Sequence, residues 1–415
     1  MKNDKKGNMS IISSVFDEVM NSFIEDQDII IEDESERAKL RFQDRKRKLK
    51  IWANSKKCMF HGCEKNSIPN SHTIQKKGSL QIISESGHLL TPTFNPNVER
   101  ISLEKTGVKK ASTFPGFCKQ HESIFSSFEN KTEFQNDKDV RLQIFRTISR
   151  ELIVKQLHLI HFKKMKESYI DFRNKKLMSH FEEKIGNKFI KENNIQLKSL
   201  SFNNIDDRER MLNEQIHEIT DDIKDFNKDF YNAICNDLEI GNENELSIIG
   251  YNIEFQIPVC LAGRGNFHFK DGDIVINVDA VLLVLPFEDY TLVFGATPQR
   301  NKDYLIKYLD MFTQHSLLLL TMIEGWMLYG SDHWFLKPSI WDKITPVIQM
   351  DIAKSIANIE KDIGHPCDIS IFNELRKIIL NDLEEYNFEN LQQSFKEFIA
   401  KEKEKLKKSY KLGVK

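Results

Sequence analysis

Three cysteines and a histidine have the types and spacing suited to holding a metal ion. Cys58 and Cys63 frame the run C-M-F-H-G-C, and Cys118 and His121 frame C-K-Q-H. Zn²⁺ prefers four Cys or His ligands in a tetrahedron, commonly two from a knuckle and two from a helix start. Gly62 allows a tight knuckle, and the i, i+3 spacing places the second pair on one side of a helical turn. These residues therefore predict a structural Zn²⁺ site; the alternative is four unrelated residues, with Cys118 in a core.

The elements that must position these ligands follow from the sequence between them. Short apolar runs, L-Q-I-I and H-L-L-T-P-T-F, are separated by turn residues and suit small strands and loops. A knuckle, small strands and a ligand-bearing helix make the treble-clef arrangement. We expect residues 55–130 to form such a module, held together more by its metal than by an apolar core.

His72, in S-H-T-I-Q-K, follows the second cysteine by nine residues. This position resembles that of the HNH nucleases, in which a His on the first strand after the knuckle activates water. In that family a separate divalent metal, Mg²⁺ or Mn²⁺, polarises the scissile phosphate. Thr113 stands where the family has Asn, and Ile124 and Phe125 stand where it has its final His. The resemblance implies His72 as a candidate catalytic residue; the alternatives are a further zinc ligand or a structural hydrogen-bonding residue.

A basic segment precedes the Cys and His residues. It reads S-E-R-A-K-L-R-F-Q-D-R-K-R-K-L-K-I-W, and Ser35 is suited to be the N-cap of a helix. Positive side chains on such a helix can contact nucleic-acid phosphates. The candidate nucleic-acid-binding residues are Arg41, Arg45, Lys46, Arg47 and Lys48. The alternative is a solvated helix face that partly neutralises the acidic patch before it.

Hydrophobic periodicity predicts an α+β protein. Apolar residues repeat at three and four over 139–182 and 206–238, which indicates long amphipathic helices. Between 247 and 296 the runs become β-branched and partly alternating, which favours four or five antiparallel strands, and helices return afterwards. We therefore expect a helical N-terminal segment with the basic helix (1–54), a treble-clef-like zinc module (55–130) and a mainly helical mixed domain (139–415) containing a small antiparallel sheet.

Composition limits the class of protein. The chain has 415 residues, a formal net charge of −2 and six cysteines. Six cysteines are too few for a disulfide framework and suit a metal site in a reducing compartment. The N-terminus lacks the apolar core of a signal peptide, and no apolar run approaches the roughly 20 residues that span a bilayer. We expect a cytoplasmic protein with no membrane contact; the sequence does not set its oligomeric state.

The motif C-x4-C…S-H-x-I-Q-K…A-S-T-F-P-G-F-C-x-x-H-E-x-I-F resembles an uncharacterised bacterial family and is distantly similar to treble-clef and HNH modules. In that family an N-terminal zinc motif precedes a larger mixed domain without an established reaction. The resemblance extends into R-T-I-S-R-E-L-I-V-K and, more loosely, D-H-W-F-L-K-P-S-I-W. It implies an association with mobile elements and phage-defence loci.

Three functions follow as hypotheses. The first is a zinc-binding protein that contacts DNA, RNA or a protein partner in defence against phage or foreign DNA. The second is an HNH-like, metal-dependent nuclease that uses His72. The third is an enzyme or sensor site in the C-terminal domain. Whether the protein is an enzyme stays open at this point; a nuclease is the leading class if it is one.

Overall fold

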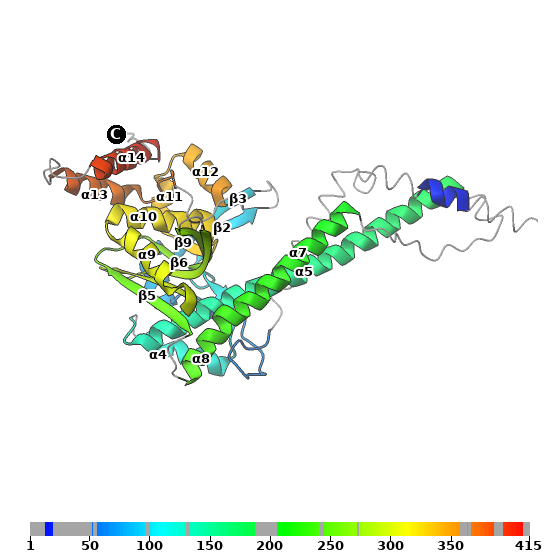
Figure 1. The fold of residues 1–415 in the computed structure, drawn as a ribbon, viewed down its shortest axis with the longest axis horizontal. Helices are drawn as coiled ribbons and strands as arrows, with labels where there is room; N and C mark the ends of the chain where they lie inside the picture. Colours follow the sequence, from blue (N-terminus) through cyan, green and yellow to red (C-terminus); the bar gives the residue numbers. More distant parts are fainter. Residues whose placement is uncertain are drawn as a thin grey trace, which may run out of the picture. The chain divides into compact units, whose positions relative to one another are not determined.

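The structure, a computed structural model, describes residues 13–19, 52, 56–95, 100–129, 133–186, 206–240, 245–271, 274–356, 363, 367–385 and 393–409. The chain divides into two compact units. The first is Met1–Trp52 with Val154–Lys224, and the second is Ala53–Ile153 with Asp225–Lys415. Helix α5 (Asp137–Ile185) contributes residues to both units (Figure 1). Residues 56–129, within the range expected to form a separate module, belong to the same unit as the strands of 247–296.

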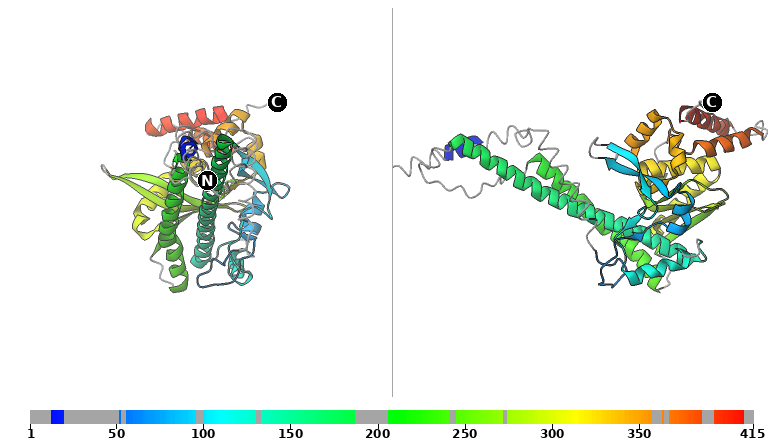
Figure 2. Two further views of the ribbon diagram at one scale, coloured as in Figure 1. Left: turned by 90° about the vertical axis from the view of Figure 1, so that its right-hand side faces the viewer. Right: turned by 180° about the vertical axis from the view of Figure 1, so that it is seen from behind.

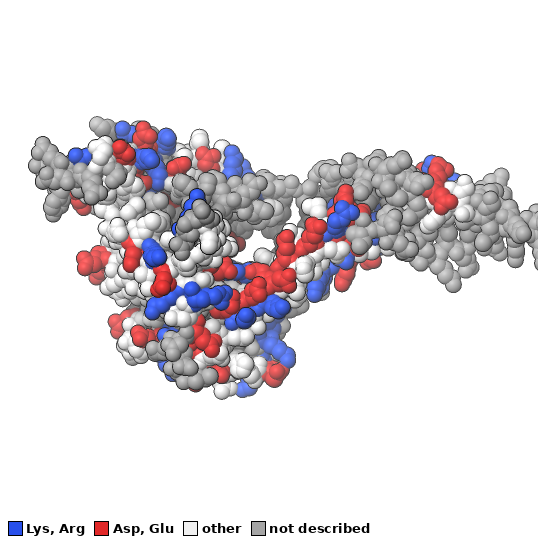
Figure 3. Space-filling model, in the orientation of Figure 1, with Lys and Arg blue, Asp and Glu red and all other residues white. Residues whose placement is uncertain are grey.

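The first unit is helical where the structure describes it. The C-terminal part of α5, most of α7 (Asp207–Phe226) and residues 13–19 supply its helices. A small apolar cluster joins them: Val19, Tyr169, Leu177, Phe181 and Leu212. Helix α7 carries several acidic side chains, which Figure 3 shows along the side of the helix turned to the viewer.

An antiparallel sheet is the centre of the second unit. Its strands are β2 (His88–Asn95), β3 (Arg100–Gly107), β5 (Leu246–Ile253), β6 (Val259–Asp271), β7 (Ile274–Pro286), β8 (Thr291–Pro298) and β9 (Trp334–Leu336). The order across the sheet is β3-β2-β9-β6-β7-β8-β5, and every neighbouring pair is antiparallel. The β2–β3 hairpin, far earlier in the sequence, joins through one pairing of Leu90 with Leu336.

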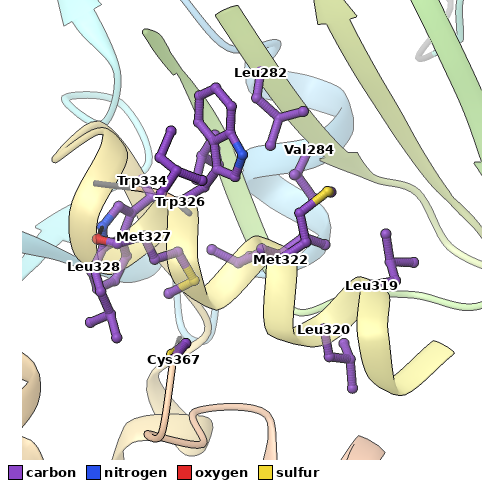
Figure 4. Packing of buried hydrophobic residues seen from close by; sticks show 14 of the residues in the cluster. Leu282, Val284, Leu319, Leu320, Met322, Trp326, Met327, Leu328, Trp334 and Cys367 are labelled. Atoms are coloured by element: carbon purple, nitrogen blue, oxygen red, sulfur yellow. Dashed lines mark hydrogen bonds between the residues drawn. The ribbon is translucent and has the colours of Figure 1, made fainter. Parts of the chain in front are cut away.

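Helices α9 (Lys302–Thr313) and α10 (Ser316–Gly325), followed by the π-helical turn η6 (Trp326–Gly330), pack on the sheet. Strand β7 offers Leu282 and Val284 to this layer, since alternate residues of a strand face the same side. Figure 4 shows these two residues beside Trp326 and Trp334. Both tryptophans are fully buried. Each Nε1–H has a partner: Trp326 donates to the Tyr308 hydroxyl at 3.0 Å and Trp334 to the Met327 carbonyl at 2.9 Å.

The C-terminal helices form a further layer over α10. Figures 1 and 2 show α13 (Asn373–Glu385) and α14 (Gln393–Ser409) beyond it, on the side away from the sheet. The Arg376 guanidinium lies fully buried between the carboxylates of Glu324 and Glu402, one from α10 and one from α14. A buried charge is tolerated only when it is paired in this way, so Arg376 fixes α13 and α14 on α10.

The expected mixture of helix with an antiparallel sheet is confirmed, but the sheet is larger than the four or five strands expected. Strands β5 to β8 occupy the predicted range of 247–296. Strands β2, β3 and β9 complete seven strands within the described part of the chain. Pairings between segments so distant in sequence leave no local periodicity, which is why the sequence assigned β2 and β3 to a separate module.

Candidate metal centre

The first pair of ligands lies on a tight knuckle. Gly62 has a backbone φ of +69°, a conformation that residues other than Gly rarely adopt. The backbone N–H of Cys63 donates to the Phe60 carbonyl at 3.1 Å, and that of Cys58 donates to the Lys65 carbonyl at 2.8 Å. These bonds fold the chain back on itself, so both thiols come from one short turn.

The second pair lies at the start of a short helix. Cys118 is the N-cap of α3 (Lys119–Glu122), and His121 follows within its single turn. The turn before this helix brings the Gly116 backbone close to the Phe114 ring. A Cβ at position 116 would lie only 2.3 Å from that ring, so the turn needs Gly. The Gly116 carbonyl accepts a hydrogen bond from the Met59 N–H at 2.9 Å, which ties the helix start to the knuckle.

The four predicted ligands converge. The ligand atoms of Cys58, Cys63, Cys118 and His121 all lie within 4.8 Å of one another. The His121 Nδ1 atom is 3.4 Å from the Cys58 Sγ atom and 3.5 Å from the Cys118 Sγ atom. A tetrahedral ion with metal–sulfur and metal–nitrogen bonds of the lengths typical of zinc separates S and N by about 3.5 Å. The cluster can therefore hold a metal ion, and its geometry is compatible with zinc.

The electrostatics of the cluster suit a cation. Burial raises the pKa of the Cys58 thiol to about 11, so an apolar environment alone would keep this thiol protonated. Burial also opposes ionisation of Cys118, but hydrogen bonds from the His121 N–H and from Cys58 outweigh it and lower the pKa of Cys118. Burial, followed by the nearby charge of Lys65, lowers the pKa of His121, which keeps its imidazole neutral. A neutral imidazole and thiols that lose a proton on binding are the forms that coordinate a metal.

Aromatic rings pack against the ligand His121 and against one another beside the cluster. Phe60 stacks on the His121 imidazole with centroids 4.0 Å apart and an interplanar angle of 19°. Phe60 also contacts the edge of Phe145, which comes from α5. Phe117 lies between Phe125 and Phe145, at centroid distances of 4.9 and 5.4 Å. An aromatic core therefore lies behind the ligands, whereas the sequence pointed only to the metal.

His72 lies outside the four-ligand cluster. It is in β1 (Ser71–His72), directly opposite Thr113 of β4 (Thr113–Phe114). Burial, then the charge of Arg146, lowers the pKa of His72 to about 4, so the ring is neutral at pH 7. The buried Nε2 atom has no hydrogen-bond partner in the described protein. Of the two residues compared with the final HNH histidine, Phe125 is buried in the aromatic cluster and Ile124 is half-buried.

A buried charged group lies beside His72. The Arg146 guanidinium, from α5, bonds to Glu129 Oε1 at 2.9 Å and lies 3.6 Å from Glu122 Oε1. Its carbon atom Cζ lies 4.5 Å from the centroid of the Phe125 ring. Burial raises the pKa of Glu122, and the charge of Arg146 opposes this effect. The sequence had not pointed to Arg146, because its role depends on how α5 packs against the ligand helix.

A second polar contact missed by the sequence joins this region to the sheet. Ser112 has φ +58°, unusual for a residue with a side chain, and its Oγ atom lies 3.1 Å from His333 Nε2. His333 Nδ1 lies 2.7 Å from the Ala262 carbonyl, which can only accept. The His333 proton is therefore on Nδ1, and Ser112 donates to Nε2. Both side chains are buried.

The five candidate nucleic-acid-binding residues, Arg41, Arg45, Lys46, Arg47 and Lys48, lie outside the residues that the structure describes. No protein-family model, curated protein or solved structure matches this chain. Across the described helices, none is both long and apolar enough to cross a bilayer.

Proposed function

We propose that this protein binds structural Zn²⁺ through Cys58, Cys63, Cys118 and His121 in a treble-clef-like module and contacts nucleic acid. The observation that carries the zinc assignment is the convergence of four ligand atoms within 4.8 Å. Three thiolates and one imidazole form a closed tetrahedral set, which is typical of structural zinc and leaves no open position for catalysis. Zinc bound there would join the knuckle to the ligand helix and so stabilise the surface around them.

Local charge supports nucleic acid as the partner. The chain as a whole has a net charge of −2, but residues 55–121 contain ten Lys and Arg residues against four Glu and no Asp. Lys57, Lys65 and Lys119, next to the ligands, are exposed. The basic segment with Arg41, Arg45, Lys46, Arg47 and Lys48 immediately precedes this span in the sequence. Several positive groups acting together give the salt-dependent affinity typical of phosphate recognition. A role in defence against phage or foreign DNA extends this proposal.

The test measures metal and nucleic-acid binding on the same samples. Elemental analysis should find one zinc per chain in the wild type and much less in Cys118→Ala. Fluorescence anisotropy with labelled DNA and RNA should show affinity that falls steeply with salt. Reversal of Arg45, Lys46 and Arg47 to Glu should weaken binding at least tenfold and reduce the salt slope. Reversal of three exposed lysines elsewhere, Lys270, Lys302 and Lys307, is the matched control.

Two results would contradict different parts of the proposal. Absence of zinc from wild-type protein purified without chelators would overturn the metal assignment. Equal binding by the two triple variants, or binding that does not depend on salt, would overturn the nucleic-acid assignment. A protein partner would then be the better hypothesis. Plaque formation on cells with wild-type protein or Cys118→Ala would test the role in defence.

A metal-dependent nuclease is a second candidate, favoured by one observation. The neutral His72, with a buried and unpartnered Nε2 atom, has the protonation state of a general base. The neighbouring Arg146 would oppose Mg²⁺ or Mn²⁺ at this place. Cleavage of plasmid or RNA that needs a divalent cation and is lost in His72→Ala, with zinc content unchanged, would support this candidate. No cleavage with any divalent metal would exclude it.

A further inference from the structure

Strand β3 lies at one edge of the seven-stranded sheet. It pairs with β2 on one side, and no described strand pairs with its other side. The outward N–H and C=O groups of an edge strand are a template for adding another strand. A groove of about 810 Å³ follows this edge. It is lined by Arg100, Ile101, Ser102 and Leu103 of β3 and by Trp341, Pro346, Gln349, Met350, Ala353 and Lys354.

Exposed apolar side chains gather beside the groove. Helix α12 (Pro346–Ile356) contacts β3 and carries Val347, 62% exposed, and Met350, 46% exposed. Phe94, opposite Ile101 in the sheet, is 61% exposed. Such large apolar groups, next to an open strand edge, mark an interaction surface. The Ser102 Oγ atom, from the strand itself, is buried and has no hydrogen-bond partner in the described protein.

The sequence of β3 is complementary to itself in one antiparallel register. If Ser102 faces Ser102 of a second strand, Arg100 faces Glu104 and Ile101 faces Leu103. Directly opposite side chains share a face of the sheet. Ile101 and Leu103 would then form one apolar face, continuous with Phe94 and α12. The opposite charges of Arg100 and Glu104 would meet on the other face.

We propose that β3 pairs with β3 of a second copy of this chain across a two-fold axis at Ser102. The pairing joins two sheets into one, with the backbones of the two Ser102 residues at the axis. Arg100 and Glu104 are both exposed. In the dimer Arg100 of each copy faces Glu104 of the other, which gives two ion pairs. The exposed Phe94, Val347 and Met350 extend the contact on both sides of the axis. Figure 1 shows β3 and α12 side by side.

Charge exchange tests the register. Sedimentation velocity of the full-length protein should show a dimer whose dissociation constant rises about tenfold or more in Arg100→Glu, because this change places Glu opposite Glu twice. Glu104→Arg should raise the dissociation constant by a similar factor, because it places Arg opposite Arg twice. The double variant Arg100→Glu/Glu104→Arg should restore the wild-type constant to within about threefold, since both pairs are re-formed with exchanged signs. Circular dichroism verifies that each variant is folded.

Cross-linking tests the axis independently. Two cysteines at position 102 would face each other at a Cα separation of about 5 Å, within disulfide range, and mild oxidation should cross-link Ser102→Cys into covalent dimers. Thr106→Cys, on the same strand, is the control, because its two copies would lie about 27 Å apart. A monomer at every concentration would overturn the proposal. So would a dimer insensitive to Arg100→Glu, a double variant as weak as the singles, or equal cross-linking of the two cysteine variants.

Discussion

The core of the sheet and the region around the metal ligands both contain buried polar atoms, but the two regions differ in how those atoms are paired. The sheet core is the apolar cluster centred on Trp326 and Trp334, and both indole N–H groups have acceptors. The ligand region, residues 56–79 and 111–149, contains nine buried polar atoms without a hydrogen-bond partner in the described protein. They belong to His72, Thr73, Gln75, Ser79, Glu122, Gln143, Arg146 (two atoms) and Ser149.

This difference indicates different roles. An unpartnered buried polar atom costs about 1–3 kcal/mol, so native proteins keep few of them, and those that occur mark water, ligand or functional positions. The buried indole N–H groups of the sheet core are hydrogen-bonded, as expected for a region with a structural role. The ligand region combines a cluster that can hold a metal ion, the buried Arg146 and a neutral His72. We therefore expect the sheet core to determine global stability, and the ligand region to depend on its ion and to open more readily.

Removing the metal should cause the largest change in the difference in stability between the ligand region and the sheet core. Structural zinc contributes about 10–16 kcal/mol of apparent binding free energy in zinc-finger peptides. Here we expect the phenylalanine cluster to retain part of the structure when the metal is removed. Cys118→Ala, or a strong chelator, should remove the ion and raise amide exchange in residues 56–72 and 113–122. Strands β6, β7 and β8 should remain protected. Hydrogen–deuterium exchange with mass spectrometry measures both regions in one experiment.

Cys260→Ala is the matched control for Cys118→Ala. Cys260 is also fully buried but lies in β6, away from the ligands. This change should leave the metal content unchanged and lower the free energy of unfolding by about 1–2 kcal/mol. Equal exchange in the two regions after metal removal would mean that the ligand region and the sheet core unfold as one unit.

The ligand set could be predicted from sequence, whereas its surroundings could not. Cys58, Cys63, Cys118 and His121 are set by local geometry: a Gly-containing knuckle and an i, i+3 pair need no distant partner. The Phe145 and Arg146 contacts depend on where α5 packs, and the sequence shows only that α5 is helical.

Some strands of the sheet could likewise be predicted from the sequence, and others could not. Strands β5 to β8 lie within one stretch of about 50 residues that is β-branched and partly alternating, and β6, β7 and β8 pair with their neighbours in sequence, so the sequence predicted these strands. Strand β9 is three residues long and pairs with β2 and β6, which come from distant parts of the chain. No local signal reports such a pairing, so the sequence did not place β2 and β3 in this sheet.

The second largest effect should come from the sheet core itself. Trp326→Ala removes a fully buried indole together with its hydrogen bond to the Tyr308 hydroxyl. We expect a loss of about 3–5 kcal/mol in the free energy of unfolding, measured by urea denaturation. The zinc content of the folded protein should not change. Met311→Ala, at a side chain 48% exposed, should change stability by less than about 0.5 kcal/mol. Loss of zinc in folded Trp326→Ala would show that the metal cluster depends on the sheet core.

The smallest effect concerns the contact between the two regions, Ser112 with His333. Burial, then the charge of Arg150, lowers the pKa of His333 well below its ordinary value, so the native state keeps this ring neutral. Its contribution to stability is therefore complete above pH 6.5, where the unfolded chain is also neutral. It declines as pH falls below that value, because unfolding then takes up a proton, with a slope of at most about 1.4 kcal/mol per pH unit. His333→Gln can still donate to the Ala262 carbonyl and accept from Ser112, so it should cost about 1 kcal/mol at pH 7.5 and flatten the slope.

The measurement that isolates His333 is the difference in urea midpoint between His333→Gln and wild type from pH 7.5 to pH 5. His72 contributes in the same direction, because burial lowers its pKa to about 4. It is present in both proteins and cancels in the difference. His217→Gln, at a side chain 78% exposed, should follow the wild-type curve. If the difference between His333→Gln and wild type does not narrow toward low pH, the neutral His333 is not what stabilises this contact.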